Sequence, residues 1–114
     1  MKRLFFLLFI IGLAVTSCAK KVEISKTDYP EFVGEWKAND GVSSYDLIIP
    51  SSGKSGWSKL SGVSSNNTSG KAKILPDKDV LQIFNKRFDI GKYPALNTDG
   101  YWTMTLDGLI YQRL

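Results

Sequence analysis

The 114-residue sequence has no histidine and a single cysteine. The missing histidine excludes Ser-His and Cys-His catalysis, histidine-based zinc sites and the commonest general base near neutral pH. One cysteine has no partner within the chain for a disulfide bond. From residue 31 onward no ten-residue stretch has helical periodicity, which excludes a helical bundle for that part of the chain.

The remaining polar residues also give little support to catalysis or cofactor binding. Asp77 and Asp79 flank Lys78 in a turn without the ligand spacing of a calcium loop. The letters GKS at 53–55 resemble the end of a phosphate-binding loop, but Ile48 stands where that loop needs glycine. The eleven acidic residues fall mainly in turns or on outward faces. We therefore expect no enzyme activity, no metal and no cofactor.

The one long apolar run lies near the start of the chain. Lys2 and Arg3 precede residues 4–15, a run of secretory length that is too short to span a bilayer comfortably. The letters LAVTSC that end at Cys18 resemble the lipobox of bacterial lipoproteins. The resemblance implies that residues 1–17 are a signal peptide cleaved after Ser17, and that acyl chains on Cys18 anchor the protein stably to a membrane.

After this cleavage residues 18–114 would remain, with a formal charge of +2 in place of +4 because Lys2 and Arg3 are lost. No basic stripe is left that would favour nucleic acid. Residues 18–30 are predicted to be the lipidated cysteine and a tether, followed by a domain over 31–114. Because Ala19 follows the cysteine, the resemblance favours the outer membrane of a bacterial cell envelope.

Turn residues divide the domain into short segments that alternate apolar and polar side chains, which predicts an all-β fold. The expected strands are 31–38, 43–50, 56–61, 70–75, 79–84, 87–91, 101–106 and 109–114. Residues 62–70 are interpreted as a mobile loop. Eight strands favour a small up-and-down antiparallel β-barrel, which has no exposed edges, and a β-sandwich is the alternative.

The last two strands form the clearest hairpin. A two-residue turn at Asp107-Gly108 places Leu106 opposite Leu109 and Met104 opposite Tyr111. The same register puts Trp102 opposite Arg113.

Two short segments resemble the lipocalin superfamily: VGEWK at 33–37 and YQRL at 111–114. The first contains the Gly-x-Trp motif as Gly34 and Trp36, and Arg113 matches the family's arginine on the last strand. The resemblance implies that Trp36 closes one end of a barrel, with Arg113 across its indole. It also implies the small bacterial lipocalin-like lipoproteins as the nearest class.

Trp57 has less apolar support on its strand than the other two tryptophans, and two interpretations remain open for it. It plugs the end of a barrel, or it lies with Tyr93 at an open rim and contacts a ligand. We expect a monomeric, membrane-anchored protein that binds a small apolar molecule or a protein partner. The alternatives are an envelope inhibitor of a lysozyme or secreted protease, with residues 19–30 entering the active site, and a structural accessory lipoprotein without a ligand.

Overall fold

The computed structural model describes residues 20–114, and Cys18 with its signal segment lies outside this range. The described chain consists of ten β-strands and one turn of 3₁₀ helix, η1, at Pro30–Phe32. The strands are β1 (Val22–Glu23), β2 (Gly34–Asn39), β3 (Ser44–Ile49), β4 (Ser55–Ser61), β5 (Ser64–Gly70), β6 (Ala72–Leu75), β7 (Val80–Ile83), β8 (Lys86–Leu96), β9 (Trp102–Leu106) and β10 (Leu109–Arg113). The all-β prediction is confirmed.

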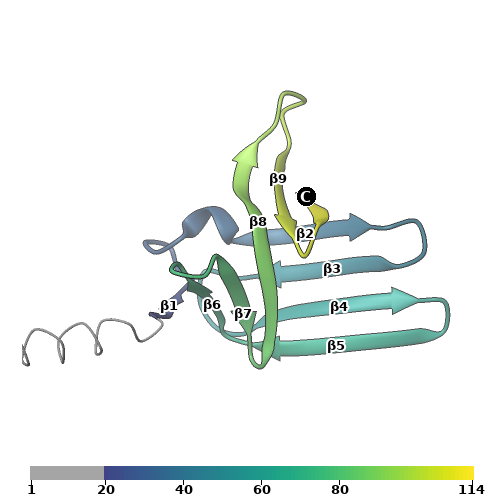
Figure 1. Ribbon diagram of the computed structural model, residues 1–114, viewed down its shortest axis with the longest axis horizontal. Helices are drawn as coiled ribbons and strands as arrows, with labels where there is room; N and C mark the ends of the chain where they lie inside the picture. Colours follow the sequence, from purple (N-terminus) through teal and green to yellow (C-terminus); the bar gives the residue numbers. More distant parts are fainter. Residues whose placement is uncertain (1–19) are drawn as a thin grey trace, which may run out of the picture.

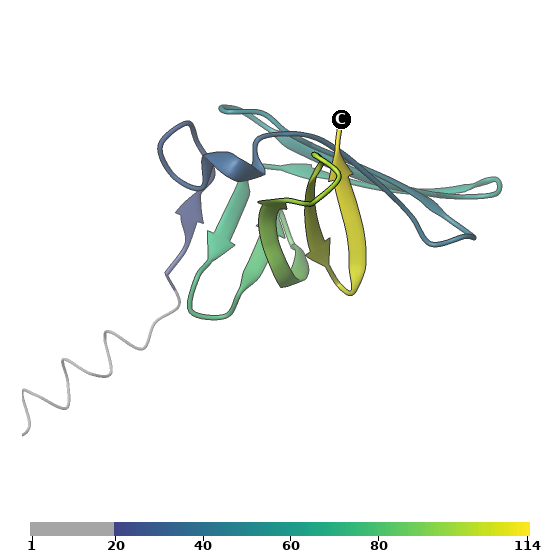
Figure 2. The ribbon, with the colours of Figure 1, turned by 90° about the horizontal axis from the view of Figure 1, so that it is seen from above.

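All strands belong to one antiparallel sheet in the order β1-β6-β7-β8-β9-β10-β2-β3-β4-β5. Two meanders, β2–β5 and β6–β10, are joined where Arg113 pairs with Trp36. In Figure 1 the strands of the first meander run side by side, and β8 crosses them. Figure 2 shows β2–β5 edge-on, with β6–β10 on one side of them, so the sheet folds back on itself in two layers.

The sheet does not close within residues 20–114. β5 and β6 follow each other in the chain, but they stand at different places in the sheet order and share no ladder. The edge of β6 is taken by β1 instead, through the pairing of Val22 with Ile74. The described strands therefore do not pair into the expected closed barrel of eight strands. The two-layer arrangement is consistent with the alternative, a β-sandwich.

Two segments that the sequence assigns to a loop and a tether contain the additional strands. β5 lies inside the expected mobile loop 62–70 and pairs with β4 at seven positions, from Ser61–Ser64 to Ser55–Gly70. Gly62, with φ of +58°, makes the tight turn between them. β1 lies inside the expected tether, where the Ile24 side chain is buried and its N–H donates to the Ala72 carbonyl oxygen at 3.0 Å.

The core lies between the two layers. The inward residues of β2, β3 and β4 form a cross-strand row in which Trp36 pairs with Leu47 and Leu47 with Trp57. The predicted register of the last hairpin is confirmed: Leu109 pairs with Leu106, and Tyr111 with Met104. The fully buried residues come from both layers and include Phe32, Trp36, Leu47, Ile49, Ile74, Leu81, Ile83, Met104 and Leu106. Along the part of the chain that the structure describes, no helix has the length and apolarity to cross a membrane.

Candidate functional site

Arg113 lies in a first aromatic cluster with Phe32, Trp36 and Trp102. We call these four residues the closed side. The guanidinium carbon of Arg113 lies 5.7 Å from the ring centroid of Trp36 and 4.8 Å from that of Trp102. Arg113 Nη1 also donates to the Val33 carbonyl oxygen at 3.5 Å. The Trp36 indole N–H donates to the Phe32 carbonyl oxygen at 2.9 Å, which ties η1 to the sheet.

Gly34 is required at this position by the approach of Arg113. A Cβ at Gly34 would lie 2.7 Å from Arg113 Cδ, and the backbone φ of +144° is one that side chains rarely adopt. The three residues of the expected motif, Gly34, Trp36 and Arg113, are thus brought together. Arg113 lies close to both rings and to Gly34, which is an arrangement typical of packing.

Tyr93 belongs to the surroundings of the closed side. Its ring centroid lies 5.9 Å from that of Phe32, and its hydroxyl donates to Asp79 Oδ1 at 2.8 Å. Burial, together with this hydrogen bond and the nearby carboxylate, raises the pKa of Tyr93 to about 12. The expected pairing of Tyr93 with Trp57 is not formed, because the aromatic partners of Trp57 are Tyr45 and Phe88.

A second aromatic cluster surrounds Trp57, and we call it the mouth: Tyr45, Trp57, Phe88 and Tyr111, with Lys59 and Lys86. The ring of Trp57 lies 5.6 Å from that of Phe88 and 6.3 Å from that of Tyr45, measured between centroids. Tyr45 and Tyr111 are also 6.3 Å apart, in an edge-to-face arrangement. These separations lie within the favourable range for aromatic pairs.

Trp57 is held in the mouth by burial of its side chain and by one hydrogen bond. Its side chain is only 7% exposed, and the indole N–H donates to the Tyr111 hydroxyl oxygen at 3.1 Å. Burial raises the pKa of the Tyr111 hydroxyl to about 12, so that hydroxyl stays protonated at neutral pH. Trp57 is therefore a wall of the mouth and not a mobile side chain on its rim.

Two lysines complete the mouth. Lys86 Nζ lies 4.3 Å from the ring centroid of Trp57 and 5.1 Å from that of Phe88. Lys59 Nζ lies 5.6 Å from the ring centroid of Tyr45. Both side chains are half-buried, and their ammonium groups lie over the aromatic rings as in cation–π contacts.

Two carboxylates also border the mouth, and each accepts at least one backbone hydrogen bond. Asp40 accepts hydrogen bonds from the backbone N–H groups of Val42 and Ser43 and from the Tyr45 hydroxyl. These bonds, with Ser43 the largest contribution, lower the pKa of Asp40 to about 2. Asp107 Oδ1 accepts the backbone N–H of Asp89 at 2.8 Å.

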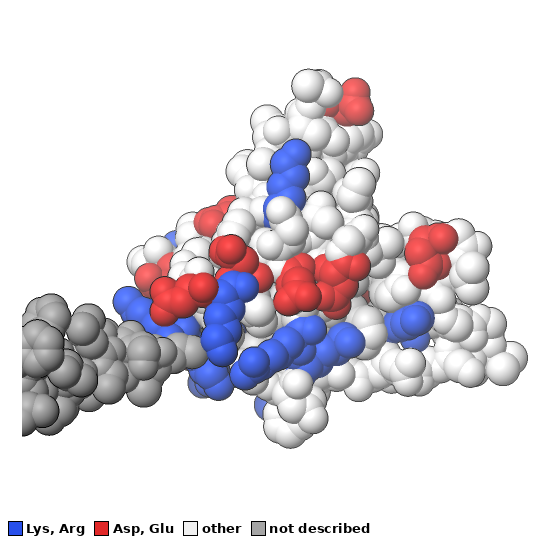
Figure 3. All heavy atoms as spheres, viewed as in Figure 1, with Lys and Arg blue, Asp and Glu red and all other residues white. Residues whose placement is uncertain are grey.

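These residues enclose a cavity of about 400 Å³, lined by the mouth residues and by the β9–β10 turn. On the face seen in Figure 3, basic side chains gather over β4, β5 and the β7–β8 turn, with acidic side chains next to them. The interior of the fold is filled by buried side chains such as Leu47, Met104 and Leu106. The cavity is therefore a recess at the surface and not a tunnel through the core.

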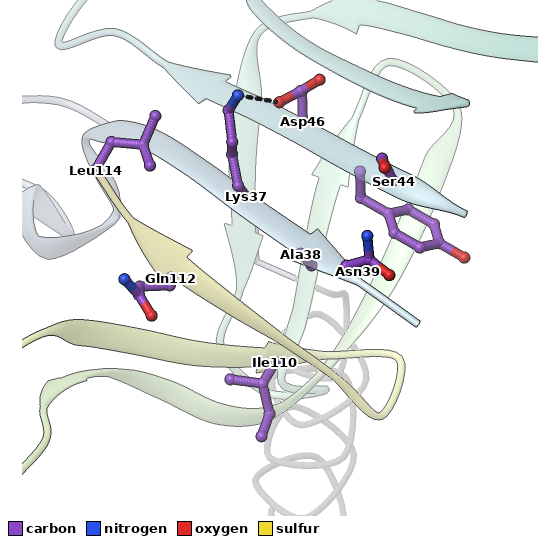
Figure 4. Close-up of a pocket in the computed structure, with 9 residues that line it drawn as sticks. Lys37, Ala38, Asn39, Ser44, Asp46, Ile110, Gln112 and Leu114 are labelled. Carbon is purple, nitrogen blue, oxygen red and sulfur yellow. Dashed lines mark ion pairs between the residues drawn. The ribbon is translucent and has the colours of Figure 1, made fainter. Parts of the chain in front are cut away.

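A larger hollow of about 490 Å³ lies on the outer face of β10, β2 and β3. Figure 4 shows Ile110, Gln112 and Leu114 on one side of it, and the ion pair of Lys37 with Asp46 on the other. That pair spans 3.7 Å between two exposed side chains, and Ile110 and Leu114 are 64% and 69% exposed. Because this hollow is more open than the mouth and lacks its cluster of aromatic rings, the mouth is the stronger candidate for a binding site.

The mouth offers aromatic rings and charged side chains to a bound molecule. Among residues 20–114 no three acidic, cysteine or histidine side chains gather in a way that could hold a metal ion. Comparisons with protein-family models, curated proteins and solved structures find no match to this chain.

Sequence reasoning identified Trp57 but missed the lysines and Tyr45 as its neighbours. A period-two signal was available, because Trp57 and Lys59 stand two residues apart on β4, and Lys86 and Phe88 stand two residues apart on β8. Each strand thus presents one aromatic ring and one lysine on the same face. The sequence pattern does not predict how the sheet folds to turn these two faces toward each other.

Proposed function

We propose that this protein is a membrane-anchored lipoprotein of the bacterial cell envelope, and that its lipocalin-like domain binds a small, largely apolar ligand in the mouth. The observation that carries the proposal is the cavity of about 400 Å³ with four aromatic walls. Ligand sites are typically concave, apolar and about 300–1,000 Å³ in volume, with a few polar groups that orient the ligand.

The lipocalin-like part of the proposal is supported by the closed side. Gly34, Trp36 and Arg113 are in contact there, and β10 pairs with β2 as the last and first strands of an up-and-down barrel would. In this proposal the domain is a barrel whose wall is open between β5 and β1, the two edge strands of the sheet. The docking of β1 along β6 favours ligand binding over the inhibitor alternative, because part of the segment required as an inhibitory arm is held in the sheet.

Ligand binding is tested with the full chain in nanodiscs of zwitterionic lipid, against empty nanodiscs as the blank. We expect a set of small aromatic compounds to include binders that shift one of the three indole N–H resonances. That resonance should be the one missing from Trp57→Phe. The mouth is not a ligand site if every compound that binds shifts only the resonances of Trp36 and Trp102.

The anchor is tested separately by metabolic labelling with a fatty-acid analogue. The wild-type chain should be labelled and should fractionate with membranes, and Cys18→Ser should lose the label. The control is Ser17→Ala, which keeps a small residue before the cysteine. Equal labelling of wild type and Cys18→Ser would contradict the lipoprotein assignment and leave the ligand proposal unaffected.

A further inference from the structure

The two lysines of the mouth differ from the carboxylates beside them in their hydrogen-bond and ion-pair partners. Asp40 and Asp107 accept hydrogen bonds from backbone N–H groups. Within residues 20–114, the ammonium groups of Lys59 and Lys86 make no ion pair and no side-chain hydrogen bond, since both observed ion pairs involve other lysines, Lys37 and Lys71. Each lysine therefore has N–H donors in the mouth without a protein partner among these residues, whereas Asp40 Oδ1 already accepts two backbone hydrogen bonds and Asp107 Oδ1 accepts one.

Both lysines lie over aromatic rings and form no ion pair in the described part of the chain, and the positive charge of Lys59 also helps to lower the pKa of Asp40. Lys86 lies over Trp57 at 4.3 Å, and Lys59 lies over Tyr45 at 5.6 Å, so that aromatic surface orients both cations. An aromatic ring attracts a cation, but it is a weaker hydrogen-bond acceptor than a charged oxygen. An anion that enters the mouth gains charge-assisted hydrogen bonds from these lysines without first having to break an ion pair.

From this asymmetry we infer that the ligand is a small amphipathic organic anion, whose flat apolar body contacts Tyr45 and Trp57, and whose anionic group is bound by Lys59 and Lys86. The inference rests on the proposed function and specifies the ligand class of the same site. The size of the recess supports a compact body, because buried Leu47 and Met104 close the interior to a long acyl chain.

The test uses two probes with the same apolar body, naphthalene-2-sulfonate and naphthalene-2-sulfonamide, of which only the first is charged. Binding to the full chain in zwitterionic nanodiscs is measured by titration calorimetry, with empty nanodiscs as the blank. We expect the sulfonate to bind at least about fivefold more tightly than the sulfonamide. Fivefold corresponds to about 1 kcal/mol, the interaction of one charge pair near 4 Å in water.

Variants locate the charge effect. Lys86→Gln and Lys59→Gln should each weaken sulfonate binding about fivefold and change sulfonamide binding less than about twofold. The matched control is Lys37→Gln on the outer face, which removes the same charge away from the mouth and should leave both affinities within about twofold. Urea unfolding of each variant verifies that the domain is folded before binding is compared.

The outcomes separate this inference from the proposed function. If the two probes bind equally and neither mouth lysine matters, the anion specificity is wrong while ligand binding in the mouth stands. An equal loss for Lys37→Gln also overturns it, because the effect would then be one of net charge. If neither probe binds and no compound shifts the Trp57 resonance, the proposed function fails and this inference fails with it.

Discussion

The closed side and the mouth both place a cation over an indole ring, but they differ in what else the cation contacts. Arg113 lies between two tryptophan rings, bonds the Val33 carbonyl oxygen and packs against Gly34. Lys86 lies over Trp57 and Phe88, with its hydrogen-bond donors free of side-chain partners in the described chain. A cation over an indole ring thus appears once with a hydrogen bond to the backbone and once without a hydrogen bond to another side chain of the described residues.

The difference shows how one kind of interaction can serve either stability or binding. A cation that packs between two rings and bonds the backbone contributes to folding, and its removal loses that packing and that hydrogen bond. A cation with unused donors contributes less to folding, but those donors are available to a ligand. Substitutions on the closed side should therefore affect unfolding most, and substitutions in the mouth should affect binding most.

The largest expected effect is that of Trp36→Ala. Trp36 is 1% exposed and its indole N–H bonds the Phe32 carbonyl oxygen, so the substitution opens a cavity and releases η1. We expect a loss of about 3–5 kcal/mol in the free energy of unfolding, measured by urea denaturation. Trp57→Ala should cost less, about 2–3 kcal/mol, because water in the mouth can fill the space. A larger loss for Trp57→Ala would reverse the roles of the two regions.

The second prediction compares the two cations directly. Arg113→Ala should cost about 1–3 kcal/mol through lost packing and the lost hydrogen bond to Val33. Lys86→Ala should cost only about 0.5–1 kcal/mol, the contribution of an exposed cation–π contact. Lys54→Ala, in the exposed link between β3 and β4, is the control and should leave the urea midpoint unchanged. Equal midpoints for Arg113→Ala and Lys54→Ala would show that Arg113 has no structural role.

The closed side was largely predictable from the sequence, for a physical reason. The alternation of apolar side chains and the Asp107-Gly108 turn fix the register of the last hairpin, and that register carries Arg113 to Trp102. Arg113 then lies near Trp36 if β10 pairs with β2, as it does in the structure. Each step depends on a local pattern or on one topological rule.

The open edge and the position of Tyr93 were not predictable in the same way. β5 carries serine, asparagine, threonine and glycine on both faces, so no hydrophobic alternation marks it as a strand, and its pairing with β4 comes from backbone hydrogen bonds. β8 continues past Gly91 to Leu96, with register shifts between Ile90 and Lys92 and between Lys92 and Ala95. Such irregularities bend a strand, and here they take Tyr93 to Phe32 and away from Trp57.

The third prediction compares Gly34, which lies against Arg113, with Gly56 on β4. Gly34→Ala should cost about 1–2 kcal/mol, because the positive φ is strained for alanine and the new Cβ meets Arg113 Cδ. Gly56→Ala on β4, where the space beside the backbone is open, should change the free energy of unfolding by less than about 0.5 kcal/mol. Thermal unfolding of the two variants measures the contrast. Similar melting temperatures would mean that Arg113 moves aside at no cost.

The smallest expected effect is a titration at the border of the mouth. Hydrogen bonds from the backbone of Ser43 and Val42, and from the Tyr45 hydroxyl, hold the pKa of Asp40 near 2, below its ordinary value of 3.8. Because the folded-state pKa is the lower one, the stabilisation is complete above about pH 4 and is lost as the pH falls through 2. A carbon-detected NMR titration should show the Asp40 carboxyl changing near pH 2. In Tyr45→Phe, which removes one of the three bonds, the midpoint should move upward. A midpoint near 4 in the wild type would mean that these bonds do not hold the carboxylate, and that Asp40 is free to compete with an anion for Lys59.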